Sequence, residues 1–239
     1  MASTQEICFQ FDISEHEKDK LVGEVIRYVL FKTEQNSGCP IRREDLTQLI
    51  TGKGYRQRNL HAVIINDAIS KLSSIFGYEM RELQRSRSSA TANPGRASQS
   101  QHSVGDAKSY ILISELPSDV YGKFVEDKST VHISGLTFVV IGIIHLGGGR
   151  ITEENLWHHL RRLGLHENEE NHPKFSNTKL ALEALVQQRY LQKEKVNGPE
   201  GNTVFYELAE RALDAPIYDK IKEYVAQIVQ KDVTSLETD

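Results

Sequence analysis

The sequence predicts a mainly α protein with small β-hairpins, an α+β fold built as two winged-helix domains in tandem. Two observations carry this prediction. Three helical patterns are followed by two strand patterns, and the same order occurs twice along the chain. The stretch from Gly147 to Leu165 also carries both the start and the stop signals of a short buried helix. Three helices followed by a β-hairpin are typical of a winged helix, a relative of the helix-turn-helix.

The helix expected within Gly147 to Leu165 has both of its ends specified. Thr152 is placed to cap the free amides of the first turn, and acidic residues follow it where the helix dipole favours negative charge. Gly164 suits a left-handed stop. Leu156, Leu160 and Leu163 are predicted to share one side of this helix, with Trp157 at the edge of that side.

The segments around this helix complete the second domain. Leu136 to Leu146 is almost wholly apolar, and its periodicity fits a helix or a strand. It is far shorter than the roughly 20 residues that span a bilayer. The following hairpin favours the helix. Downstream, the pattern predicts a helix, a strand, a turn and a returning strand: Thr178–Arg189, Tyr190–Val196, Asn197–Asn202 and Thr203–Leu208.

The first domain is predicted from the same kinds of pattern. Its elements are three helices and two strands: Leu21–Lys32, Arg42–Ile50, Arg58–Phe76, Tyr78–Leu83 and Tyr110–Leu116. Between the two strands, Arg85 to Lys108 is rich in Ser, Arg, Gln, Ala and Gly and has almost no apolar residues. Such a segment buries too little surface to order itself, so we expect a mobile loop there.

These elements divide the chain as follows: an N-terminal tail (1–16), a first winged-helix domain (17–116) with the mobile loop 85–108, a connecting helix (117–130), a second winged-helix domain (131–212), and a C-terminal helix and tail (213–239). The last helix, Ala215 to Val229, carries an apolar stripe. We expect that stripe to dock on the domain or on a partner.

Composition excludes several classes of function. The net charge of -4 and the pI near 6.2 do not indicate a nucleic-acid binder, and two cysteines are too few for a disulfide framework. We expect an intracellular protein without a secretion signal or membrane anchor. No phosphate loop, nucleophile elbow or zinc motif occurs, and the adjacent His158 and His159 point about 100° apart. The prediction is therefore no enzyme, no metal and no cofactor.

Two stretches resemble the melanoma-antigen (MAGE) homology domain. Val25 to Lys32 followed by Pro40 to Leu46 resembles the opening of that domain, and Gly149 to Trp157 followed by Leu163-Gly164 is similar to its second-half signature. The likeness covers roughly Lys18 to Ala212. Because the chain is compact with short flanks, it looks most like the ancestral branch of the family, a subunit of the SMC-type complex for DNA repair and chromosome maintenance.

The resemblance implies a non-enzymatic nuclear subunit that bridges two proteins. The first domain binds a RING-type ubiquitin-ligase subunit, and the second binds the kleisin subunit of an SMC complex. Two adjacent apolar residues meet the RING partner in the family; Val29-Leu30 matches them, and Leu30-Phe31 is the alternative register. For the kleisin partner, the corresponding candidates are Leu156, Trp157, Leu160 and Leu182.

The resemblance also implies contact with double-stranded DNA without sequence specificity. Basic residues flank the third helix and wing of the second domain, the parts that a winged helix lays on DNA: Lys174, Lys179, Arg189, Lys193 and Lys195. A second candidate set is Arg43, Lys53, Arg56 and Arg58. No membrane or small-molecule partner is expected. Two other functions remain open: a free-standing winged-helix transcription regulator, and a MAGE-type ubiquitin-ligase cofactor outside the SMC complex.

Overall fold

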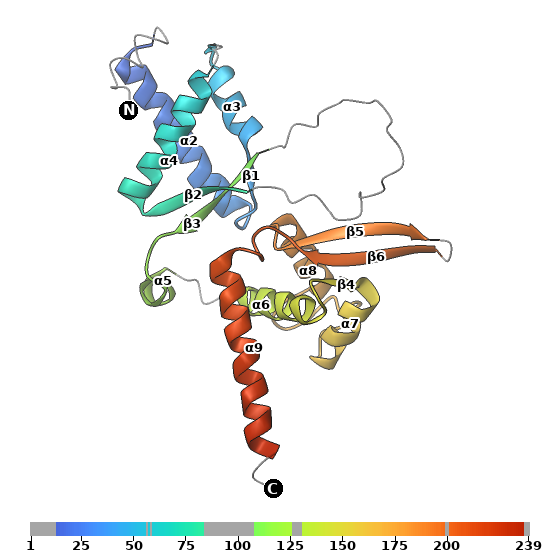
Figure 1. Cartoon of the computed structure of the whole chain (residues 1–239). Coiled ribbons are helices and arrows are strands. Elements are labelled where there is room, and N and C mark those ends of the chain that lie inside the picture. The colour runs from blue at the N-terminus through green and yellow to red at the C-terminus, as the bar shows by residue number, and fades with distance from the viewer. Residues whose placement is uncertain are drawn as a thin grey trace, which may run out of the picture. The chain divides into compact units, whose positions relative to one another are not determined.

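The computed structural model describes residues 13–55, 57, 59–83, 108–125, 131–198 and 201–236, with side chains up to residue 227. It forms two compact units, Met1–Phe124 and Val125–Asp239, drawn in Figure 1. The loop predicted at 85–108 lies outside the described residues except for Lys108.

The first unit combines three packed helices with a small sheet. Its elements in order are α2 (Glu15–Gln35), β1 (Ile41–Arg42), α3 (Arg43–Thr51), α4 (Leu60–Phe76), β2 (Tyr78–Leu83) and β3 (Ser109–Ser114). The sheet order is β1-β3-β2, and both pairings are antiparallel. A short helix, α5 (Ser118–Phe124), follows; it covers part of the connecting helix predicted at 117–130, of which residues 126–130 are not described.

Helix α2 begins earlier than the apolar pattern indicates, because a capping box sets its start. The Ser14 hydroxyl accepts a hydrogen bond from the Glu17 amide at 3.2 Å, and the Glu17 carboxylate accepts one from the Ser14 amide at 3.0 Å. The backbone and side-chain hydrogen bonds from Ser14 lower the pKa of Glu17. The Ser-x-x-Glu spacing was therefore a start signal in the sequence.

The three helices of the first unit enclose an apolar core and are also joined by ion pairs. Residues of α2, α3 and α4 with no exposed surface, among them Val25, Leu46 and Ile64, form the centre of that core. Across α2 and α4, Lys18 pairs with Asp67 at 2.6 Å, and the Lys18 side chain is almost fully buried. Apolar packing and a buried charge pair thus fix α2 against α4.

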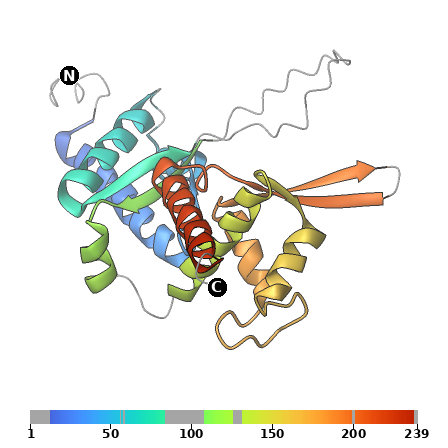
Figure 2. The ribbon, with the colours of Figure 1, turned by 60° about the horizontal axis from the view of Figure 1, so that its bottom comes forward.

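The second unit repeats this architecture. Its elements in order are α6 (Val131–Leu146), β4 (Arg150–Thr152), α7 (Glu153–Arg162), α8 (Thr178–Gln187), β5 (Leu191–Gly198), β6 (Gly201–Leu208) and α9 (Ala215–Leu236). The sheet order is β4-β6-β5, again antiparallel. The β5–β6 hairpin extends from the helices as a wing (Figure 1; Figure 2). The prediction of tandem winged helices within an α+β fold is confirmed.

The ambiguous apolar segment is a helix. Leu136, Val140 and Ile144 are buried at a spacing of four residues, and a helix presents such positions on one side. The predicted ends of α7 are also observed. The Thr152 hydroxyl accepts a hydrogen bond from the Asn155 amide at 3.2 Å, and Gly164 adopts a left-handed φ of 81°.

Leu163 departs from the prediction for α7. The helix ends at Arg162, so Leu163 lies at the cap, and its side chain is 58% exposed. It does not share the buried side of Leu156 and Leu160. The prediction that Leu163 faces inward is therefore wrong.

The last helix docks on its own unit. Ile221 of α9 is buried in a small apolar cluster with Ile141 of α6 and Ala212. Tyr224 meets the ring of Phe138 edge-on, with 5.2 Å between ring centroids. The apolar stripe of α9 was expected to dock on the domain or on a partner. Its first half packs on the second unit itself.

Candidate interaction surfaces

The apolar triplet at the end of α2 points in three directions. Val29 is buried in the core, Leu30 is half-buried and packs against that core, and Phe31 is 63% exposed. Successive helical residues differ by about 100°, so Val29 and Phe31 lie about 200° apart and cannot share one surface. The assignment of Val29 to partner contact is therefore corrected: Val29 is a core residue, and the outward pair is Leu30-Phe31, the alternative register.

Phe31 belongs to a mixed aromatic and basic face of α2. Arg27 lies one turn earlier on the same side of the helix and is exposed. Within the described part of the chain, Arg27 has no acidic partner. Aromatic residues, including Phe, and Arg are both enriched in the cores of protein interfaces. We call Arg27, Leu30 and Phe31 the α2 face.

The four residues predicted for kleisin binding lie inside the second unit. Leu156 and Leu160 have no exposed surface, and Trp157 and Leu182 are almost fully buried in the same cluster. A partner that docks on the folded chain cannot reach them. This assignment is corrected: the residues belong to the apolar core of the second unit. Apolar residues at helical spacing share one side of a helix, and here that side faces the core.

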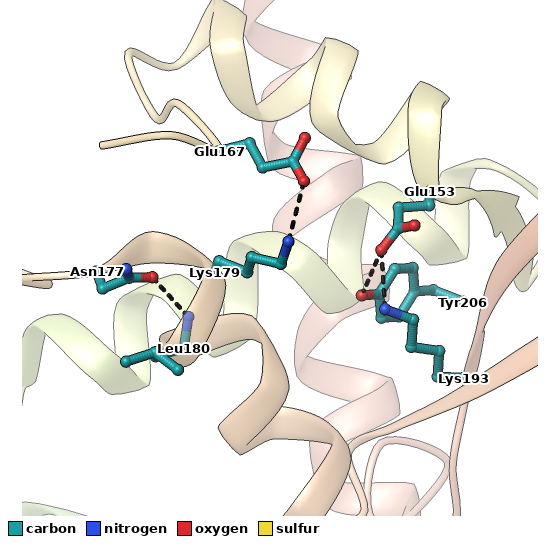
Figure 3. Close-up of polar contacts among 7 residues, drawn as sticks. All are labelled: Glu153, Glu167, Asn177, Lys179, Leu180, Lys193 and Tyr206. Atoms are coloured by element: carbon teal, nitrogen blue, oxygen red, sulfur yellow. Dashed lines mark hydrogen bonds and ion pairs between the residues drawn. The ribbon is translucent and has the colours of Figure 1, made fainter. Parts of the chain in front are cut away.

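Three of the five cations predicted for DNA contact are paired with acids. Lys179 lies 3.4 Å from Glu167, Lys193 lies 2.9 Å from Glu153, and Arg189 forms a two-pronged pair with Glu210 at 2.6 and 3.0 Å. Figure 3 shows the first two pairs. A phosphate group must compete with a carboxylate for each of these cations, which weakens its attraction. The charge of these three residues is therefore partly compensated, and their contact with DNA stays a prediction.

The Lys193–Glu153 ion pair is part of a three-residue network that includes Tyr206. Glu153, the first residue of α7, accepts hydrogen bonds from Lys193 of β5 and from the Tyr206 hydroxyl of β6 at 2.9 and 3.2 Å (Figure 3). Burial raises the pKa of Tyr206. Partial burial alone would lower the pKa of Lys193, but its interactions with Glu153 and Tyr206 raise it. The ammonium therefore stays charged and paired, and the network joins α7 to the wing.

The remaining two predicted cations are exposed. Lys174 lies in the loop before α8, and Lys195 lies on β5; neither has an acidic partner among the residues that the structure describes. Lys174 is held through its backbone, since its amide donates to Nδ1 of His172 at 3.2 Å.

Of the second candidate set, Lys53 pairs with Glu24 and Arg43 contacts the Tyr110 hydroxyl at 3.4 Å, whereas Arg56 and Arg58 lie outside the described residues.

The exposed side of α8 is mixed in character, since it carries Lys179 and Gln187 beside an apolar and an acidic residue. Leu180 is exposed on this side, and the acidic Glu183 follows it. Asn177, a possible base-reading residue, uses its side-chain oxygen to accept a hydrogen bond from the Leu180 amide at 2.9 Å (Figure 3). It caps α8 and is not free to bind an adenine edge.

The described residues contain no cluster of three or more His, Cys, Asp or Glu side chains able to hold a metal ion. Within the same residues, no helix has the length and apolar character needed to cross a bilayer.

Comparison with known proteins identifies the family. The family model of the MAGE homology domain matches residues 25–214. The chain belongs to the MAGE homology domain family. The two winged-helix units described above make up this domain, and α9 begins just after the end of the family match.

Similar proteins include members of two branches of the family. The chain is 28% identical over 214 residues to the "non-structural maintenance of chromosomes element 3 homolog" of Mus musculus, covering 88% of this chain and 67% of that protein. The human homolog is 25% identical, with coverages of 92% and 64%. Human "melanoma-associated antigen 8" is 25% identical, with coverages of 88% and 58%. The chain thus spans about two thirds of the length of these relatives or less.

A solved structure is also similar over nearly the whole MAGE chain. A chain of the "Nse1-Nse3-Nse4 complex" superposes with a TM-score of 0.72 at 26% identity. The match covers 94% of this chain and 96% of that chain.

Proposed function

We propose that this MAGE protein is the non-SMC element 3 subunit of an SMC-type DNA-repair and chromosome-maintenance complex. In this role it is a nuclear, non-enzymatic scaffold. It holds a RING-type ubiquitin-ligase subunit and a kleisin subunit, and it contacts double-stranded DNA without sequence specificity. One observation carries the proposal: the fold matches a chain of the Nse1-Nse3-Nse4 complex over almost the full length of both.

The α2 face supports the RING-subunit part of the proposal. Phe31 is a large aromatic side chain that the first unit leaves exposed, and Arg27 and the half-buried Leu30 adjoin it. A partner that covers this face removes apolar surface from water, and we assign the RING subunit to it. The kleisin subunit has no assigned contact residues, because all four candidates predicted from the sequence are buried.

Two alternative functions make different demands. A free-standing transcription regulator needs base-reading side chains on its recognition helix, and α8 exposes Lys179, which is paired with Glu167, and Gln187. A MAGE-type ligase cofactor outside the SMC complex uses the same RING contact but needs no kleisin subunit. Purification of the tagged chain from native cells separates the three functions. We expect both a RING protein and a kleisin in stoichiometric amounts; recovery of neither contradicts the proposal.

Replacement of Phe31 by alanine is expected to weaken binding to the RING subunit by about 2 kcal/mol or more, roughly thirtyfold. The change should leave the melting temperature of the isolated chain almost unchanged, because the ring is 63% exposed. Isothermal titration calorimetry measures the binding.

Two further variants test this assignment. Ile75→Ala removes another exposed apolar side chain from the same unit and should leave binding intact. Val29→Ala should destabilise the chain, because Val29 is buried. Wild-type affinity in the Phe31→Ala variant would remove the α2 face from the RING interface.

A further inference from the structure

The connection between α7 and α8 is long for a relative of the helix-turn-helix. In that motif a turn of three or four residues joins the two helices, whereas here the connection runs over residues 163–177. A segment of this length needs contacts of its own to stay in one conformation, because ordering its backbone costs entropy. In the second half of the connection, these contacts centre on His172.

His172 and Ser176 close a tight turn through their backbones. The His172 amide donates to the Ser176 carbonyl oxygen at 2.8 Å, and the Ser176 amide donates to the His172 carbonyl oxygen at 2.9 Å. Ser176 has a left-handed φ of 56°, which residues other than glycine adopt at an energetic cost. Further contacts must therefore help to hold the turn closed.

The imidazole of His172 supplies such contacts. Its Nδ1 atom accepts hydrogen bonds from the amides of Lys174 and Phe175, both at 3.2 Å. An imidazole nitrogen accepts only when it carries no proton, so the neutral ring holds its one proton on Nε2. The side chain thus closes the turn in the way that Asn and Asp side chains do in an Asx turn.

Phe175 anchors this turn on the second unit. The His172 ring stacks on the Phe175 ring with 5.0 Å between centroids, and the His132 ring of α6 lies 5.4 Å from the same ring. Phe175 itself packs against the apolar core of the unit. Because α8 begins at Thr178, the His172 imidazole fixes the chain just before this helix.

Protonation of His172 is incompatible with the closed turn. The second proton goes to Nδ1, where both amide N–H groups point, so two hydrogen bonds are lost and donors face a donor. Contact of the charged imidazole with the Phe175 ring offsets only part of this loss, because one cation–π contact is weaker than two hydrogen bonds.

Other titratable groups shift the pH of opening without reversing its direction. The acids of the connection favour a charged imidazole, whereas the lysines and a charged His132 oppose it. These groups are His132 on α6, Glu169 and Glu170 before the turn, Lys174 within it, and the Lys179–Glu167 pair at the start of α8.

We propose that His172 is a pH-sensitive latch of the α7–α8 connection: the neutral imidazole closes the turn 172–176, and uptake of one proton on Nδ1 opens it. Since the closed turn requires the neutral ring, its stability is present at high pH and is lost as the pH falls through the range in which histidine titrates. The latch does not depend on the proposed function, because it needs no partner.

The test is amide hydrogen exchange of the isotopically labelled full chain, followed by NMR between about pH 8 and about pH 5.5, where an imidazole changes its charge. Protection of the Lys174 and Phe175 amides, relative to an unstructured chain at the same pH, should fall about tenfold with acid, the equivalent of one lost hydrogen bond each. The His172 imidazole nitrogens are followed in the same sample, and both changes should share one midpoint. Circular dichroism checks that the chain stays folded.

Three variants accompany the wild type. His172→Asn is the informative one, because an Asn carbonyl oxygen accepts from the amide two residues on and takes up no proton. It should keep the turn protected at both pH values, whereas His172→Ala should leave it unprotected at both. His166→Asn makes the same change at an exposed imidazole of the same connection and should keep the wild-type response.

Constant protection of the two wild-type amides over this pH range would overturn the latch. A wild-type response in His172→Asn would overturn it too, since another group, with His132 the first candidate, would then be the switch. Different midpoints for the His172 imidazole and the two amides contradict the latch without reference to any variant. Loss of protection throughout the second unit also contradicts it, because the acid effect would then be global unfolding.

Discussion

Replacement of Leu160 by alanine is expected to lower the free energy of unfolding of the second unit by about 2–5 kcal/mol. Leu160 has no exposed surface and packs in the same cluster as Leu156, Trp157 and Leu182. Removal of its branched end leaves a cavity that this close-packed core fills only in part. Trp157 is the only tryptophan of the chain, so its fluorescence reports the unfolding of this unit during a urea titration.

A matched control lies three residues away. Leu163→Ala makes the same chemical change at the end of the same helix, but its side chain is 58% exposed. We expect its effect to stay within about 0.5 kcal/mol. If Leu160→Ala is as stable as the wild type but loses a protein partner, then Leu160 is a contact residue, and its assignment to the core is wrong.

Replacement of Asp67 by alanine is expected to destabilise the first unit by about 3 kcal/mol, the lower end of the range for a broken buried ion pair. The Lys18 ammonium lies 2.6 Å from Asp67, and the Lys18 side chain is only 6% exposed. Without the carboxylate, the Lys18 ammonium remains buried without a counter-ion. Asp67 itself is 36% exposed, so water relieves part of the cost. Urea denaturation followed by far-ultraviolet circular dichroism measures the change.

The control for Asp67 is an exposed pair between the same two helices. Asp19 pairs with Lys71 at 2.9 Å, with side chains 62% and 41% exposed. Asp19→Ala should cost about 0–1 kcal/mol, because water already screens this pair. Equal effects of the two substitutions would show that the burial of Lys18 contributes nothing to stability.

Most of the fold was predictable because its signals are local. Cap residues such as Thr152 and Gly164 act within one turn, and the strand pattern of each wing lies in a continuous run of sequence. Strands β1 and β4 were missed because two or three residues carry no periodicity. They exist only because β3 and β6, distant in sequence, provide partners for their backbone groups.

The candidate surfaces were less predictable than the fold, for two reasons. A family resemblance identifies a helix as a contact element, but a one-residue difference in register turns a side chain by about 100°. Val29 and Phe31 show the consequence, since one is core and the other is exposed.

The second reason concerns charge. A run of cations in the sequence does not show which acids they meet. Lys193 pairs with Glu153 from forty residues earlier, and Lys179 pairs with Glu167 across the α7–α8 loop. Arg161 and Arg162 lie in the last turn of α7. Their exposure without a described acidic partner emerges only once the chain is folded.

The central claim is that this chain joins a RING-type subunit and a kleisin subunit in one assembly. The most direct test is to mix the purified chain with both subunits from the same organism and measure the mass of the eluting species by size-exclusion chromatography with light scattering. We expect a single 1:1:1 complex whose mass is the sum of the three proteins. Elution of the chain alone at its own 27.1 kDa, with both subunits present in excess, would contradict the claim.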